Sequence, residues 1–350
     1  MNYKKQHGFS LVELMVATVI SILLSYAVME VYVAQTLIYK TANSQDLIQS
    51  TENAIANLVT PVIRSAGFAG CATMNTAVSN LNEGGSNPIG TLNTLPTLVA
   101  GYNCSSPNSS QSNAANSNNA SNWTPTLDAT LVGNVQNSSD VLVILGATPG
   151  SFPTGITSID PGSSSFTTQS TGGIPLAAGQ FGAVSDCVKT SVFQITAVNG
   201  TTISHDSGSG AYTNANAAFS LNYQIGSQFI SLQQTAFFVG QGSGGQSALM
   251  RATLIGGAWT IQPLVPGVSA MKVQYGIGNN GSMTQYVTAD AVTNWAAIYS
   301  IRLGFLIEGQ VASGTKNATQ YTLLGTSVTV PADNRLRHSY EITINLRNAT

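Results

Sequence analysis

The chain has 350 residues, its formal net charge is -2, and only 7% of its residues are Asp, Glu, Lys or Arg. Ordinary soluble proteins carry about 25% charged residues, so a surface built from Ser, Thr, Asn, Gln and Gly fits a protein held outside the cytoplasm. With a net charge of only -2, the chain has no positive electrostatic field that would attract nucleic acid, and we expect no binding of nucleic acid.

The first 34 residues combine a basic head with a long apolar run. Residues 1–8, MNYKKQHG, include Lys4 and Lys5, and the run from Phe9 to Ala34 approaches the ~20 apolar residues that cross a bilayer. A secretory signal peptide would end its apolar region in a small-residue site such as A-x-A, and this run does not. Its small residue, Gly8, comes before the run, so cleavage there would leave the apolar helix as an anchor.

The run contains a carboxylate, Glu13, five residues after the glycine. A charge near the bilayer interior costs about 2.5 to 3.5 kcal/mol on insertion scales, so it persists where a partner compensates it. The alternative is a carboxylate that reaches toward the interface and has no further role.

The string GFSLVEL, from Gly8 to Leu14, resembles the processing signature of type IV pilins and related pseudopilins. The resemblance implies that a prepilin peptidase cleaves between Gly8 and Phe9 and that Phe9 is then N-methylated. It also implies that Glu13 pairs with the amino terminus of a neighbouring subunit, because opposite charges attract strongly in a low dielectric. Glu13 is therefore the expected subunit-assembly residue.

Residues 35–66 continue the helix in an amphipathic form. Apolar residues recur at spacings of seven, four and three, which places Ile48, Ile55, Val59 and Val62 on one stripe. Neither Gly nor Pro occurs in residues 9–60, so we expect one helix of about 50 residues, about 75 Å long.

Residues 67–350 are expected to form a β-rich domain, with a solvent-facing low-complexity loop at residues 105–122. Apolar runs rich in β-branched residues predict strands at 141–145, 192–198, 229–239, 248–255, 259–265, 268–275, 298–307, 321–330 and 340–346. The sequence therefore predicts an α+β fold, in which a long helix packs on an antiparallel β-rich domain.

The three cysteines, Cys71, Cys104 and Cys187, leave the disulfide pairing open. In an oxidising compartment one pair can form and one thiol remains. Proximity in sequence mildly favours Cys71 with Cys104, Cys187 is an alternative partner for either, and three buried reduced thiols are a further alternative.

Residues that commonly carry catalysis or bind cofactors are sparse. GQGSGG, residues 240–245, has the spacing of a dinucleotide-binding loop, but apparent strands on both sides favour a hairpin turn. His205 and Asp206 are adjacent and favour a polar turn over a catalytic pair. We expect no enzyme activity, no cofactor and no metal site.

Later strings resemble the minor pilins of the PilW family. They are AGFAGC at 66–71, SDVLVILGA at 139–147, VSDCVKTSVFQIT at 184–196 and RLRHSYEITINLRN at 335–348. The resemblance implies a minor pilin that initiates type IV pilus assembly or sits at the pilus tip. It implies a single-pass inner-membrane protein with a periplasmic domain, and as partners the other minor pilins, the major pilin and the inner-membrane assembly machinery.

Two alternatives share part of this pattern. A minor pseudopilin of a type II secretion system would have the same leader, the same Glu13 and the same amphipathic helix. A membrane-tethered adhesin or surface enzyme would use the long polar segments at 105–122 and 200–225 to shape a site.

Overall fold

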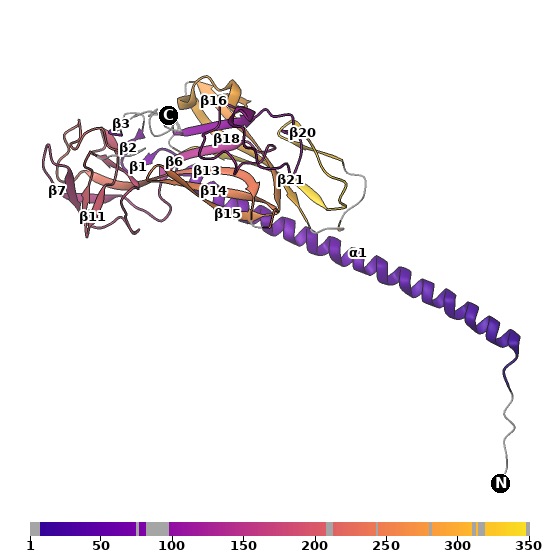
Figure 1. Ribbon diagram of the computed structural model, residues 1–350. Coiled ribbons are helices and arrows are strands. Elements are labelled where there is room, and N and C mark those ends of the chain that lie inside the picture. The colour runs from indigo at the N-terminus through magenta and orange to yellow at the C-terminus, as the bar shows by residue number, and fades with distance from the viewer. Residues whose placement is uncertain are drawn as a thin grey trace, which may run out of the picture.

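The computed structural model describes residues 8–74, 77–81, 98–207, 213–242, 244–279, 282–309, 313 and 319–347. Residues 1–7 of the expected leader lie outside the described residues. The predicted architecture, one long N-terminal helix followed by an antiparallel β-rich domain, is confirmed (Figure 1). Helix α1 (Leu11–Arg64) has 54 residues and is about 81 Å long.

The two parts of helix α1 have different surroundings. Its N-terminal part, residues 11–43, contains no buried side chain and extends away from the domain (Figure 1). From Ser44 onward one stripe is buried, consisting of Ser44, Ile48, Thr51, Ile55, Val59 and Ile63. The expected stripe is thus present, except that Ile63 is buried where Val62 was expected, because the helix turns once every 3.6 residues.

The described chain contains these further elements. The strands are β1 (Phe68–Ala69), β2 (Ala72–Thr73), β3 (Ala77–Ser79), β4 (Val99–Cys104), β5 (Trp123–Thr124), β6 (Val141–Ala147), β7 (Thr154–Ile159), β8 (Ser165–Thr168), β9 (Phe181–Ser185), β10 (Thr190–Gln194), β11 (Ala197–Asn199), β12 (Thr202–Ser204), β13 (Gln228–Gln241), β14 (Ser247–Ile255), β15 (Ala258–Pro266), β16 (Val268–Asn279), β17 (Ser282–Val287), β18 (Ile298–Glu308), β19 (Gln320–Leu323), β20 (Thr326–Thr329) and β21 (Arg337–Asn345). Short 3-10 turns are η2 (Ala120–Asn122), η3 (Ala289–Ala291) and η4 (Trp295–Ala297).

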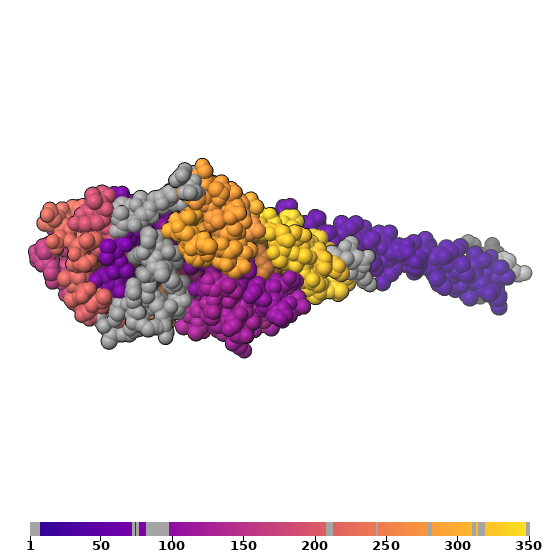
Figure 2. Space-filling model, turned by 90° about the horizontal axis from the view of Figure 1, so that it is seen from above, coloured from indigo at the N-terminus to yellow at the C-terminus, as the bar shows by residue number. Residues whose placement is uncertain are grey.

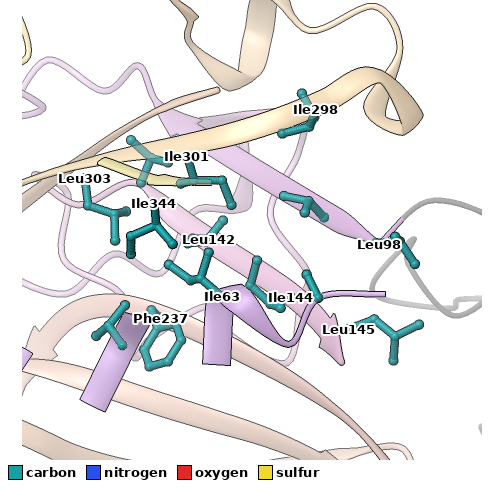
Figure 3. Close-up of a cluster of buried hydrophobic side chains, with 14 of the residues drawn as sticks. Ile63, Leu98, Leu142, Ile144, Leu145, Phe237, Ile298, Ile301, Leu303 and Ile344 are labelled. Atoms are coloured by element: carbon teal, nitrogen blue, oxygen red, sulfur yellow. The ribbon is translucent and has the colours of Figure 1, made fainter. Parts of the chain in front are cut away.

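The strands form two main sheets that share one core with α1. In the larger sheet β13 is central and pairs antiparallel with β6, β7, β9 and β14, while the smaller sheet has the order β17-β16-β18-β21. Ile63 of α1 lies among Leu142 and Ile144 of β6, Ile301 of β18 and Ile344 of β21 (Figure 3). The end of the helix therefore holds the two sheets together.

A buried ion pair also joins the two sheets. Asp140, at the start of β6, lies 3.1 Å from Lys272 Nζ on β16. Its carboxylate also accepts hydrogen bonds from the backbone N–H groups of Cys104 and Val273 at 3.0 and 2.9 Å. Because the charges are paired and hydrogen-bonded, the cost of burying them is offset, and the contact holds the register between sheets.

Residues 105–122 differ from the solvent-facing loop expected from their composition. They form a loop that ends in the short turn η2, but Ser106, Ser112 and Ser117 are buried. The backbone N–H of Ser112 donates to the Thr329 carbonyl at 2.9 Å, and Asn113 Nδ2 donates to Glu308 at 3.0 Å. Short polar side chains can satisfy backbone groups at close range, so a polar sequence here packs against the domain.

A second, smaller core lies within residues 156–229, at the end of the domain far from the projecting part of α1 (Figures 1 and 2). Its aromatic side chains include Phe166 and Phe193, which lie against His205 together with Phe219. The prediction of a polar turn at His205 is wrong, because this side chain is fully buried. Its ring stacks on Phe219 with 4.0 Å between centroids, and neither ring nitrogen has a hydrogen-bond partner among the described residues.

Shortening a side chain in the buried stripe of α1 should destabilise the whole domain. We expect Ile63→Ala to lower the free energy of unfolding by about 2 to 5 kcal/mol, the range for removing a buried aliphatic side chain. Leu58→Ala, at a site that is 43% exposed on the same helix, is the matched control and should cost much less. Thermal unfolding of the detergent-solubilised chain measures both; equal losses would contradict the packing described here.

His205 should make the domain sensitive to acid. Burial lowers the pKa of His205 from 6.5 to about 4, although the nearby Asp206 charge and Ala217 backbone oppose that shift. The unfolded chain therefore binds a proton first as pH falls, and roughly 3 kcal/mol of stability should be lost between pH 6.5 and 4. Denaturant unfolding across this range should show a smaller loss for His205→Phe, and an equal loss in this variant and in the wild type would contradict the role of His205.

Candidate functional site

The segment around Gly8 precedes the helix and is open on all sides. Gly8, Phe9 and Ser10 are exposed, and Phe9 is 89% exposed. An added Cβ at Gly8 would meet no atom within 4 Å, so the fold of this chain does not require glycine here. Among the described residues, nothing therefore shields the Gly8–Phe9 bond.

Glu13 caps the first turn of its own helix. Ser10 is the N-cap residue, and its backbone N–H donates to Glu13 Oε2 at 2.9 Å. This capping box satisfies a donor that has no partner within the helix, and it leaves lone pairs of the carboxylate available. Glu13 therefore has a local structural role in addition to the predicted assembly role, which the spacing S-x-x-E could have indicated.

The projecting part of α1 is the largest exposed apolar surface among the described residues. Its mean hydropathy reaches 2.2 in an 18-residue window with none of the window buried, so the helix is long and apolar enough to cross a membrane. The hydroxyl groups of Ser21 and Ser25 are satisfied within the helix, because they donate to the carbonyls of Ala17 and Ser21. An exposed surface of this extent requires lipid or other helices around it.

The cysteines pair as Cys71 with Cys187, which are 116 residues apart. The mild preference for Cys71 with Cys104 is therefore not met. Cys187 lies in the turn between β9 and β10, and the fold brings this turn to the segment between β1 and β2. Closing so long a loop can stabilise the fold by roughly 4 to 5 kcal/mol in the chain-entropy model.

Cys104 is a buried free thiol. Its Sγ lies 2.7 Å from the carbonyl oxygen of Asn137 and 3.6 Å from Ser106 Oγ. Burial raises the pKa of the Cys104 thiol, so the reactive thiolate is disfavoured at neutral pH. Cys104 therefore serves as a packed side chain in this fold.

Arg335, Arg337, Asp333 and Glu308 form a partly buried network of charged side chains. Arg337 is 6% exposed and contacts both Glu308 and Asp333, and Arg335 lies 3.2 Å from Glu308. The two arginine side chains and the backbone N–H of Arg335 keep the pKa of Asp333 below its ordinary value. The network lies where Ser44 of α1 enters the domain, beside Gly309.

The described residues contain no group of three or more His, Cys, Asp or Glu side chains that could hold a metal ion.

The glycine-rich string at 240–245 lies between β13 and β14, and Gly242 N donates to the Gln246 carbonyl at 2.8 Å. The predicted hairpin turn is thus confirmed for the described part of this string; residue 243 lies outside it.

Two protein-family models match the chain. The model described as Prokaryotic N-terminal methylation motif matches residues 3–28, and the model described as Type IV Pilus-assembly protein W matches residues 236–348. The second match covers strands β14 to β21 and the C-terminal part of β13. The N-terminal match covers Gly8, Phe9 and Glu13.

Among solved structures, a type IV-like pilin from Thermus thermophilus is similar at 17% sequence identity and a TM-score of 0.24, over 50% of this chain and 86% of that chain. This TM-score is too low to support a statement about the fold. No curated protein matches the sequence.

Replacing Gly8 should block removal of the leader without affecting the fold. We expect Gly8→Val to accumulate as a precursor longer by the eight residues 1–8, because a branched side chain next to the proposed scissile bond hinders the peptidase, while no described residue lies within 4 Å of a Cβ at position 8. Intact mass spectrometry of membrane fractions measures the shift. A normally processed Gly8→Val chain would contradict cleavage at this bond.

The disulfide assignment predicts a specific pattern of thiol labelling. Iodoacetamide should label no cysteine in the native chain, because Cys104 is buried and Cys71 and Cys187 are linked. After unfolding without a reductant, Cys104 alone should be labelled, as shown by peptide mapping. Labelling of Cys71 or Cys187 before reduction would contradict the pairing.

Proposed function

We propose that the chain, which matches the model of Type IV Pilus-assembly protein W over residues 236–348 and the prokaryotic N-terminal methylation motif over residues 3–28, is a minor pilin that takes part in initiating pilus assembly or in forming the pilus tip. In this proposal α1 anchors the chain in the inner membrane, the β-rich domain lies in the periplasm, and assembly transfers the subunit to the fibre. The observation that carries the proposal is the exposed apolar half of α1 beside the accessible Gly8–Phe9 bond.

Leader removal would convert the start of α1 into a charged contact. The Glu13 carboxylate already accepts a hydrogen bond from the backbone N–H of Ser10. Cleavage would leave a free α-amino group on Phe9, one residue earlier in the chain. We propose that the free lone pairs of Glu13 bind the methylated amino group of a neighbouring pilin. A carboxylate and an ammonium group attract strongly in lipid, and the pair removes the cost of a lone charge there.

The proposed function is association with other pilins, without enzymatic turnover. The methylation motif implies processing by a prepilin peptidase and contact with other pilins and the assembly machinery. The same motif suits a minor pseudopilin of a type II secretion system, whereas the match to the pilus-assembly model over residues 236–348 favours the pilus.

The first test is the amount of surface pili sheared from a deletion strain, the complemented strain and the wild type. We expect a large loss of pili that complementation restores, with type II secretion unchanged. Normal pili combined with lost secretion would overturn the pilus role in favour of secretion.

Glu13→Ala should impair assembly without preventing membrane insertion. Insertion becomes easier without the charge, whereas the contact with a neighbouring amino group is lost, so we expect at least a tenfold reduction of the chain in sheared pili. Glu30→Ala, which removes a carboxylate from the same exposed helix, is the matched control. Immunoblots of membranes and pili measure both pools, and equal incorporation of Glu13→Ala and wild type would refute the electrostatic contact.

A further inference from the structure

A hollow with two unpaired arginines lies where α1 ends. Its volume is about 590 Å³, and it is lined by Thr60, Pro61, Arg64, Ser65, Phe68 and Arg347. None of these six described lining residues carries a negatively charged side chain. A hollow of this size accommodates a ligand much larger than a single ion.

Neither arginine is used by the fold that the structure describes. Within the described residues, the cationic side chains of Lys189, Lys272, Arg335 and Arg337 pair with carboxylates, but Arg64 and Arg347 do not. Both are exposed. In a chain with only 12 Lys and Arg residues, two uncompensated guanidinium groups in one hollow are a marked concentration of positive charge.

Arg64 is also not needed to cap the helix. The carbonyls of Pro61 and Val62 accept hydrogen bonds from the backbone N–H of Ser65, and the carbonyl of Ile63 accepts from Ala66 N–H at 3.1 Å. Ser65 Oγ also donates to Val62. Since these three carbonyls have backbone donors, the guanidinium group of Arg64 is not needed for them and is available for a ligand.

The position of the hollow determines which anions can reach it. Thirty residues of helix separate Ala34, the end of the apolar segment, from Arg64, a distance of about 45 Å along α1. Lipid headgroups at the end of the apolar segment are therefore out of reach. The net charge of -2 gives no field that would attract nucleic acid.

We propose that this hollow binds an acidic segment of an adjacent pilin subunit, with Arg64 and Arg347 each engaging a carboxylate. Guanidinium groups match carboxylates with two parallel hydrogen bonds, the Thr60 hydroxyl can donate a further one, and Phe68 and Pro61 offer apolar contact to the stem of a Glu side chain. The inference rests on the proposed function only in taking the occupant to be another pilin.

The test is a photo-crosslink from the edge of the hollow in cells that carry the full chain. Pro61 is replaced by p-benzoylphenylalanine, because it is exposed and its replacement costs the helix no hydrogen bond. We expect an adduct with another pilin subunit that maps to a segment containing Asp or Glu. Arg64→Gln with Arg347→Gln should reduce the adduct at least tenfold, whereas Arg251→Gln with Arg302→Gln, which removes the same charge elsewhere, should leave it unchanged.

A charge swap completes the test. Arg64→Glu should abolish the adduct, and replacing the crosslinked acidic residue of the partner by Arg should restore it. An adduct that is insensitive to Arg64→Gln with Arg347→Gln, an adduct with a segment lacking carboxylates, or no protein adduct would overturn the proposal. An arginine-dependent adduct with a secretion pseudopilin would uphold the hollow while refuting the pilus role, so the two failures are distinguishable.

Discussion

The structure depends on one helix that must be stable in two solvents. The first part of α1 is apolar on all sides and needs lipid or other helices around it, whereas the last part is apolar along one stripe and is buried by two sheets. A continuous helix satisfies every backbone group along the way, as a membrane requires. The same continuous helix therefore connects Glu13 with Ile63 in the core of the domain.

Three kinds of contact hold the domain together around the end of α1. Ile63 joins the two sheets through apolar packing, Asp140 and Lys272 join them through a buried ion pair, and Asn113 links the 105–122 segment to Glu308. These contacts join segments that are far apart in sequence. The acid-sensitive core around His205 lies at the other end, where its loss of stability would affect the domain far from the membrane anchor.

Some β-strands were predicted and others missed for identifiable reasons. β13, β14, β16 and β18 were expected within a few residues of their observed bounds, because they are long and rich in apolar residues. Strands such as β8 (Ser165–Thr168) lack an apolar run and were missed. Residues 321–330 were expected to form one strand but form the hairpin β19–β20, because Leu324 and Gly325 have φ angles of 48° and 83°; the glycine was the available signal.

The sequence by itself determined the parts of this protein that depend on local chemistry: the methylation motif that contains Gly8, Phe9 and Glu13, the length of the helix and the β-rich character of the rest. These follow from spacing, because hydrophobic periodicity and processing motifs are properties of neighbouring residues. Only the tertiary structure decided that Cys71 pairs with Cys187, that His205 is buried, and that Arg64 and Arg347 share a hollow. Each of these depends on contacts between distant segments, which strand pairing and sheet packing create and which no local pattern contains.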